Sequence, residues 1–366
     1  MNREKNLLKI KSIIKNIYND LLYGKEPKLK IPKRTISNVN YNSGILTLGE
    51  STLERRLFDK NEVKKFVLTL LVLDTITTAI KENDYPTIRD IYYTIKHTIS
   101  YKDARNRTIN ENTVDEQQES DSIIEDIEVL LGTLREELGI TYDAKGRASG
   151  KVIIKADGDE IDLSKMGNGA WAIPSFVDNI KFKEVNAKFV LIVEKGAIFE
   201  RLNAEKIWKK YNCILATGKG QPDRGTRRFI RRLHDEFSLP VFVLVDGDSY
   251  GWYIYSVYAH GSIKLAYEST RLAIPDAKMI GVWASDIYRY KIPRRYIIRA
   301  TDADIKRAKE LLKYPWFLND KKFADEIKLF LKKKEKVEIE AFSGFGLKFL
   351  SEKYIPEKLQ INGISI

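Results

Sequence analysis

The sequence predicts a multidomain protein of mixed α/β and α+β class, in which a largely helical part precedes a doubly wound parallel sheet. Three observations predict it. Strand-like apolar runs at residues 187–193, 213–216 and 241–246 alternate with helical segments near 203–211, 223–237 and 250–260. Earlier in the chain, apolar residues recur at helical spacing. Between these two parts, residues 141–186 are rich in glycine, which is typical of a domain boundary.

Length and charge limit the kinds of protein this chain can be. Its 366 residues are enough for two or three domains, and 63 basic against 51 acidic residues give a net charge of +12. That excess favours a polyanionic partner such as nucleic acid, although a soluble protein with lysine-rich exposed helices has the same composition. Cys213 is the single cysteine, which fits an intracellular protein without internal disulfides. No apolar run is long enough for a membrane span, so we expect a cytoplasmic, nucleoid-associated protein.

Four segments are predicted along the chain. Residues 1–60 form an arm, with an amphipathic helix that Pro27 ends and short strands after it, which packs either on this chain or on a second copy. Residues 61–145 hold three helices with strand-like sequence, as in a winged-helix (CAP-like) DNA-binding domain, though a plain three-helix bundle is equally admissible. Residues 146–186 are a glycine-rich linker. Residues 187–366 form the sheet domain and a C-terminal helical region.

Acidic residues follow two of the predicted buried strands. Asp246 and Asp248 come directly after the strand at 241–246, and Glu194 follows the strand at 189–193. Ligands of open α/β sheets bind at the carboxyl ends of strands, and residues i and i+2 of an extended segment point the same way. Carboxylate oxygens suit Mg²⁺, with Mn²⁺ as a substitute. Taken alone, Asp246 and Asp248 also fit the metal site of a phosphatase or a glycosyltransferase.

Two adjacent tyrosines occupy different faces of a predicted helix near residues 88–99. Thr87 and Asp90 have the form of a capping box that starts this helix. On a helical wheel Tyr92 falls on the apolar face, whereas Tyr93 points away from it. We place Arg89, Lys96 and His97 on the side of Tyr93. Neighbouring positive charge favours the phenolate form and would neutralise a phosphate, so Tyr93 is a candidate nucleophile; an ordinary exposed tyrosine is the alternative.

Several motifs, in order, carry a resemblance to a known family. These are Arg89-Asp-Ile-Tyr-Tyr93, Glu194-Lys-Gly, Thr217-Gly-Lys-Gly220-Gln-Pro-Asp223 with Thr226-Arg227, Asp246-Gly-Asp248, Tyr267-Glu268-Ser-Thr-Arg271-Leu and Ser285-Asp286-Ile287. From about residue 62 to the end, the chain resembles the family of type IIB DNA topoisomerase A subunits and the related meiotic double-strand-break transesterase. Ser249 departs from the family pattern, which more often has proline there.

The resemblance implies a fold, a mechanism and partners. It implies that residues 187–366 are a Toprim domain, that Tyr93 joins covalently to a 5′-phosphate of double-stranded DNA, and that Arg89 stabilises the phosphorane. Glu194, Asp246 and Asp248 would hold Mg²⁺, and Glu194 would also serve as general acid or base. The chain would be a homodimer whose active site is shared between chains. Strand passage in this family needs ATP, and no ATP-binding motif is visible, so an ATP-binding topoisomerase VI B subunit is implied, in an A2B2 complex.

Basic residues outside the catalytic motifs are candidates for binding the DNA backbone. These candidates are Lys96, His97, Lys219, Arg227 and Arg228. The arginines of the helix at 223–237 also fit a solvated helix face. Two further functions stay open from the residues alone: a stand-alone Toprim metal-dependent nuclease that does not use Tyr93, and a non-catalytic winged-helix DNA-binding protein.

Overall fold

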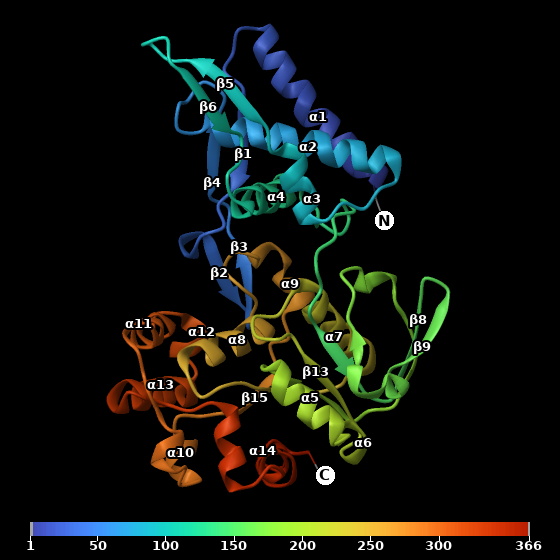
Figure 1. The fold of residues 1–366 in the computed structure, drawn as a ribbon, viewed down its shortest axis with the longest axis vertical. Helices are drawn as coiled ribbons and strands as arrows, with labels where there is room; N and C mark the ends of the chain where they lie inside the picture. The colour runs from blue at the N-terminus through green and yellow to red at the C-terminus, as the bar shows by residue number, and fades with distance from the viewer. Residues whose placement is uncertain (1–2, 365–366) are drawn as a thin grey trace. The chain divides into compact units, whose positions relative to one another are not determined.

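The computed structural model describes residues 3–364, which form two compact units (Figure 1). The first unit comprises residues 3–39 and Leu48–Asp143, and the second comprises Asn40–Thr47 and residues 144–364. No helix in this range is long and apolar enough to cross a membrane.

The first unit is mainly helical. Its helices are α1 (Arg3–Leu22), α2 (Val63–Glu82), α3 (Ile88–Ile95) and α4 (Gln117–Leu131). Its strands pair as two antiparallel ribbons, β1 (Lys28–Pro32) with β4 (Thr52–Arg56), and β5 (Thr98–Lys102) with β6 (Thr108–Asn112). The core between the helices holds apolar residues from all four of them, among them Ile10, Val72, Ile91 and Ile127.

The first 60 residues are not a separate arm. Ile10 of α1 belongs to the core of the first unit, and Ile17 packs with Leu29, Ile31 and Phe66 in a second cluster. The segment therefore packs in part on its own chain, because α1 contacts α2 and α4, whereas Leu8, Ile14 and Leu21 of α1 are exposed. Residues 40–47 belong instead to the second unit, where the strands β2 (Val39–Asn42) and β3 (Ile45–Leu48) form a hairpin.

That hairpin is fixed to the second unit through His260. The amide of Leu46 donates to the carbonyl of His260 at 2.9 Å, and Nδ1 of His260 lies 2.8 Å from the carbonyl oxygen of Gly44. Gly44 has φ of +81°, and a Cβ there would lie 2.8 Å from Pro275. Only glycine therefore suits this turn.

The second unit is built on a six-stranded sheet with the order β10-β7-β13-β12-β14-β15. The pairs β13–β12, β12–β14 and β14–β15 are parallel, whereas β7 and β10 add an antiparallel edge. The strands are β7 (Arg147–Ser149), β10 (Trp171–Ala172), β12 (Phe189–Val193), β13 (Cys213–Thr217), β14 (Val241–Leu244) and β15 (Lys278–Gly281). Every residue of β12, β13 and β14 is buried, as expected of parallel strands covered on both faces.

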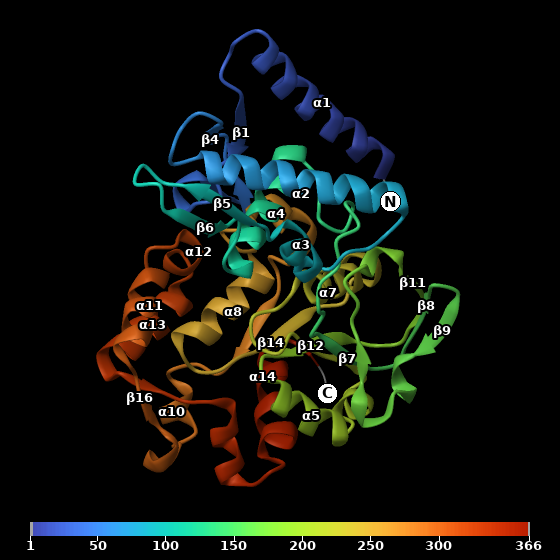
Figure 2. The same ribbon diagram turned by 45° about the horizontal axis from the view of Figure 1, so that its top comes forward.

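Helices cover both faces of this sheet (Figure 2). On one face, Phe189, Leu191 and Val193 pack against α5 (Gly196–Ala204), α6 (Ile207–Lys210) and α14 (Ile355–Ile361). Figure 2 shows α7 (Arg224–Phe237) and α8 (Ser249–Ala259) on the other face. The remaining short helices are α9 (Ser269–Leu272), α10 (Asp286–Arg289), α11 (Asp302–Leu311), α12 (Pro315–Leu318) and α13 (Lys321–Lys333), and β16 (Ile298–Arg299) pairs with β17 (Glu335–Lys336).

The prediction of a glycine-rich linker at residues 146–186 is wrong. A three-stranded antiparallel sheet with the order β11-β8-β9 fills much of it, formed by β8 (Val152–Ala156), β9 (Asp159–Asp162) and β11 (Lys181–Val185). β7 and β10 lie in the same stretch and extend the large sheet. Its glycines lie mostly at turns between short strands, which is why the composition resembles that of a linker.

Candidate active site

The helix α3 presents Tyr93 to solvent. Its start is fixed by a reciprocal cap, in which the amide of Asp90 donates to Oγ1 of Thr87 at 3.0 Å and the amide of Thr87 donates to Oδ2 of Asp90 at 2.8 Å. The amide and the hydroxyl of Thr87 both donate to Oδ2 of Asp90, and these two hydrogen bonds hold the pKa of that carboxyl below its usual value. Ile91 and Ile95 are buried in the core, so the opposite face must point outwards. Tyr93 lies on it with 59% of its surface exposed.

Arg89 lies one turn before Tyr93 and interacts with it directly. The Cζ atom of Arg89 is 5.9 Å from the centre of the Tyr93 ring. A hydrogen bond with Tyr93 and the electrostatic interaction with its phenol raise the pKa of the Arg89 guanidinium. A cation and a phenol are therefore held side by side on an exposed helix face, as a phosphate-attacking tyrosine would need.

Tyr92 is held in a different way. It is half-buried and packs against the core of the first unit. Its hydroxyl donates to the carbonyl of Asp115 at 2.8 Å and accepts from Nζ of Lys96 at 2.8 Å. Lys96 follows the end of α3 at Ile95 and binds Tyr92 directly. It also interacts electrostatically with Tyr93, whose ring centre lies 5.0 Å from that of Tyr92. His97 is exposed, and its amide donates to Oγ1 of Thr113 at 2.9 Å.

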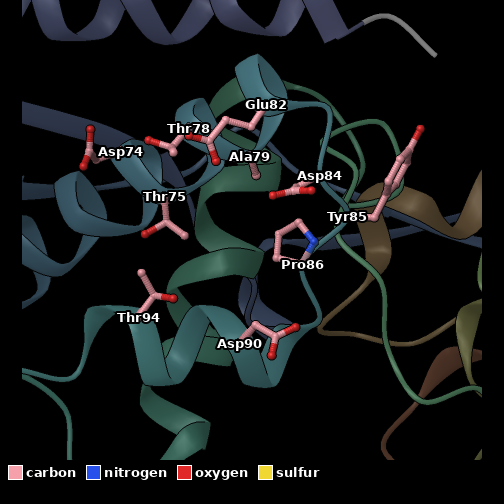
Figure 3. A pocket seen from close by; sticks show the side chains of 10 residues that line it. All are labelled: Asp74, Thr75, Thr78, Ala79, Glu82, Asp84, Tyr85, Pro86, Asp90 and Thr94. Atoms are coloured by element: carbon pink, nitrogen blue, oxygen red, sulfur yellow. The ribbon is translucent and has the colours of Figure 1, made fainter.

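A pocket of about 480 Å³ beside α3 is acidic and is not suited to DNA. It lies between the second half of α2, the loop that follows α2, and α3, from which Asp90 and Thr94 line it (Figure 3). Its other acidic lining residues are Asp74, Glu82 and Asp84. Because a polyanion is repelled by such a pocket, the Arg89–Tyr93 face is the face of α3 on which we expect a phosphate.

The structure brings Glu194, Asp246 and Asp248 to one edge of the large sheet. Glu194 follows β12 and the aspartates follow the adjacent parallel strand β14. The amide of Asp246 donates to Oε2 of Glu194 at 2.9 Å. Asp248 caps α8, because its Oδ1 accepts from the amides of Tyr250 (3.0 Å) and Gly251 (2.9 Å). The helix begins at Ser249 although that position departs from the family pattern.

Burial and mutual repulsion make two of these carboxyl groups hard to ionise. Burial, and then the charges of Asp246 and Asp248, raise the pKa of Glu194 to about 7. Burial also raises the pKa of Asp246 to about 6, with a contribution from Asp248. Concentrated carboxylates of this kind favour a bound cation, and hard oxygen donors fit Mg²⁺.

Both aspartates are paired with lysines. Nζ of Lys195 lies 3.1 Å from Oδ2 of Asp246, and Nζ of Lys336 lies 3.6 Å from Oδ2 of Asp248. Within residues 3–364, no three His, Cys, Asp or Glu side chains are gathered tightly enough to hold a metal ion. The donor chemistry thus fits the metal, whereas a ready-made set of three ligands is not present.

The side chains that contact these aspartates are not among the predicted site residues. Besides the two lysines, Glu338 and Glu340 reach the same place, since each binds Lys195 at 2.9 Å. One signal for them exists in the sequence: Val337-Glu338-Ile339-Glu340 alternates apolar and acidic residues, which would place both carboxylates on one side of an extended segment. In the structure a 3₁₀ helix begins at Ile339, and both carboxylates still reach Lys195.

The predicted DNA contacts differ in their exposure. Lys219 is exposed, and its stem lies over Gly196, where a Cβ would be 3.3 Å from its Cγ atom. Arg228 is half-buried, and its Nε donates to Asp178 at 2.7 Å. Arg227 is 1% exposed, and burial lowers its pKa to about 10, although nearby Glu268 opposes this. The expectation that Arg227 binds DNA is therefore wrong, because it points into the protein from the first turn of α7.

Comparisons with known proteins agree with this architecture. Residues 64–140 match the family described as "Type IIB DNA topoisomerase". Residues 146–186 match "All-beta domain in DNA topoisomerase VI alpha subunit". Residues 189–359 match the Toprim domain of the family that comprises the topoisomerase 6 A subunit, together with Spo11.

Similar proteins extend over nearly the whole chain. It is 52% identical to the A subunit of type 2 DNA topoisomerase 6 from Aeropyrum pernix, over 94% of this chain and 91% of that protein. It is 50% identical to the corresponding protein of Hyperthermus butylicus, over 98% of this chain and 95% of that protein. The DNA topoisomerase 6 A subunit of Arabidopsis thaliana is 35% identical over 96% of this chain and 79% of that protein.

The Toprim sheet, the acidic edge formed by Glu194, Asp246 and Asp248, and these matches together define a type II DNA topoisomerase of the type IIB class. More narrowly, the chain belongs to the family of DNA topoisomerase 6 A subunits, the DNA-cleavage subunits of that class.

Proposed function

We propose that this chain makes and reseals transient double-strand breaks in DNA through a 5′-phosphotyrosyl link at Tyr93. One observation carries the proposal: Tyr93 is 59% exposed next to Arg89, on a helix whose opposite side is anchored in the core. The ribbon β5–β6, which follows α3 directly, supports a winged-helix mode of DNA binding for the first unit.

The reaction conserves the number of phosphodiester bonds. The phenolate oxygen of Tyr93 attacks phosphorus, the bond from phosphorus to the 3′-oxygen breaks, and the released 3′-oxygen takes a proton. The reverse attack by the 3′-hydroxyl reseals the strand. Arg89 is placed to stabilise the charge that develops on the phosphoryl oxygens. Glu194 has a pKa of about 7, which suits a group that gives or takes a proton near neutral pH.

Glu194, Asp246 and Asp248 would hold Mg²⁺, for which Mn²⁺ is a possible substitute. When bound, the ion would neutralise charge on the scissile and leaving oxygens. Lys219, exposed beside Gly196, is the basic side chain of the second unit that we expect to contact the DNA backbone.

The proposal is tested by denaturing a DNA-cleavage reaction and looking for DNA covalently joined to the chain through Tyr93. A metal-dependent nuclease that does not use Tyr93 would cleave DNA without leaving an adduct. A non-catalytic DNA-binding protein would neither cleave nor leave an adduct. The three candidate functions therefore give three different results.

Changing Asp248 to asparagine should weaken Mg²⁺-dependent cleavage without unfolding the site. Asparagine also caps helices well, so the start of α8 should be preserved while one metal-binding charge is lost. We expect the cleavage rate to fall by at least about tenfold at low Mg²⁺ and to recover partly at high Mg²⁺, as a loss of metal affinity requires. Asp246→Asn should behave in the same way, and full activity of the wild type in EDTA would contradict the metal site.

The chain should need a partner subunit to bind and hydrolyse ATP. We propose an ATP-binding B subunit in an A2B2 complex, because the names of similar proteins describe an A subunit. The purified chain alone should show neither ATP turnover nor relaxation of supercoiled DNA. Both activities should appear when the B subunit is added, and steady ATP turnover by the pure chain would refute this division of labour.

A further inference from the structure

The ammonium group of Lys195 lies among three carboxylates. Its Nζ atom is 3.1 Å from Oδ2 of Asp246, 2.9 Å from Oε2 of Glu338 and 2.9 Å from Oε2 of Glu340. An ammonium has three hydrogens to donate, so all of them have a carboxylate partner here. The lysine is therefore a charged part of the acidic edge.

The backbone fixes this arrangement. Lys195 directly follows Glu194 and precedes α5. The amide of Ile339 donates to Oδ1 of Asp246 at 2.9 Å, and the amide of Gly247 donates to the carbonyl of Val337 at 2.8 Å. A Cβ on Gly247 would lie 3.0 Å from a side-chain atom of Val337, so the two segments are closely packed. Glu338 and Glu340 are thus anchored beside the proposed metal ligands.

Asp248, like Asp246, lies next to a lysine. Nζ of Lys336 lies 3.6 Å from Asp248 and 2.9 Å from Asp304. Each aspartate proposed as a metal ligand therefore faces an ammonium of its own chain, and each ammonium also has carboxylate partners outside the proposed ligand set. Lys195 is the closer of the two and has two such partners, Glu338 and Glu340.

We propose that Lys195 is a counter-ion that neutralises Asp246 before the metal binds. When the metal binds Asp246, the ammonium of Lys195 leaves Asp246 and stays paired with Glu338 and Glu340. A divalent ion and an ammonium repel each other, so they cannot share one carboxylate oxygen without cost. The affinity of the site for metal then depends on how readily the metal replaces the ammonium of Lys195 at Asp246. Glu338 and Glu340 lower the free energy needed for that replacement, because they remain partners of the ammonium. This inference rests on the metal site of the proposed function.

Two opposite effects on metal affinity follow. Lys195→Met removes the competing cation, so Mn²⁺ should bind roughly tenfold more tightly, the change that corresponds to about 1.4 kcal/mol. Changing both Glu338 and Glu340 to glutamine leaves Lys195 with Asp246 alone, so Mn²⁺ should bind more weakly. In the Lys195→Met background, the same two glutamates should matter much less, because only their general electrostatic effect is left.

The experiment is a titration of the purified full-length chain with Mn²⁺ in the absence of DNA, in which the electron paramagnetic resonance signal of free Mn²⁺ is followed. Circular dichroism should show that every variant is folded. Lys195→Arg is the matched control, because it keeps the charge; its affinity should stay within about twofold of the wild type. Unchanged or weaker binding by Lys195→Met would overturn the counter-ion role. So would an equal loss on removing the glutamates in both backgrounds.

Failure of this inference can be told apart from failure of the proposed function. The proposed metal site is wrong if the wild-type chain binds no Mn²⁺, or if it binds Mn²⁺ as tightly when Asp246 and Asp248 are both changed to asparagine. If that binding is present but does not respond to Lys195→Met, only the counter-ion role is rejected.

Discussion

Replacing Tyr93 by phenylalanine should abolish the covalent protein–DNA adduct and leave DNA affinity within about twofold of the wild-type value. The phenol oxygen is the atom that would bond to phosphorus, and phenylalanine lacks it. Most of the binding energy comes from many phosphate contacts, so one exposed hydroxyl adds little. The adduct is measured by denaturing a cleavage reaction on end-labelled DNA and separating free DNA from protein-bound DNA. Affinity is measured by fluorescence anisotropy on the same duplex.

The neighbouring tyrosine provides the matched control. Tyr92→Phe removes a hydroxyl that donates to Asp115 and accepts from Lys96, so the chain should lose about 1 kcal/mol of stability while still forming the adduct. If Tyr92→Phe abolishes the adduct and Tyr93→Phe does not, the assignment of the nucleophile is wrong.

Local sequence patterns are sufficient to orient the two tyrosines. The cap formed by Thr87 and Asp90 marks where the helix starts, and Ile91 and Ile95 mark its buried face. These signals lie within two turns of Tyr93, so its exposure follows from helical geometry alone. The buried parallel strands are predictable for a similar reason, because runs such as residues 189–193 are apolar throughout.

Features that depend on tertiary structure cannot be predicted in this way. The ribbon β5–β6 is exposed along most of both strands, so it lacks the alternation that marks a half-buried strand, and its sequence is typical of a polar loop. Arg227 lies on a helix with a clear polar face, yet the first turn of that helix is buried and Glu268, distant in sequence, lies near it. Lys195 stands out in the sequence only as part of a motif, because its carboxylate partners Glu338 and Glu340 are far along the chain.

The residues that we propose as catalytic belong to different compact units, and this determines how an active site could be assembled. Tyr93 lies in the first unit, whereas Glu194, Asp246 and Asp248 lie in the second. A double-strand break needs two nucleophiles at a fixed separation, and a two-fold dimer supplies them directly. We therefore propose that the chain acts as a homodimer in which Tyr93 of each protomer works with the carboxylates of its partner.

Mixed dimers should show this sharing as cleavage of a single strand. A Tyr93→Phe chain is paired with a Glu194→Gln chain; glutamine can still accept the hydrogen bond from the amide of Asp246, so the second change mainly removes charge. If the site is shared, one composite site carries both defects and the other carries none, so a nick should appear on supercoiled plasmid. If each chain acts alone, both sites are defective and no nick should form.

The reciprocal pairing inverts the expectation and makes the test decisive. A wild-type chain is paired with a chain that carries both Tyr93→Phe and Glu194→Gln. If the sites are shared, each of the two composite sites now carries one defect, so nicking should be lost. If each chain acts alone, the wild-type chain keeps one intact site and should nick the plasmid. Both homodimers of the single variants should be inactive under the same conditions. Nicking by the reciprocal dimer, with none from the first pairing, would refute the shared site in heterodimers verified to bind DNA.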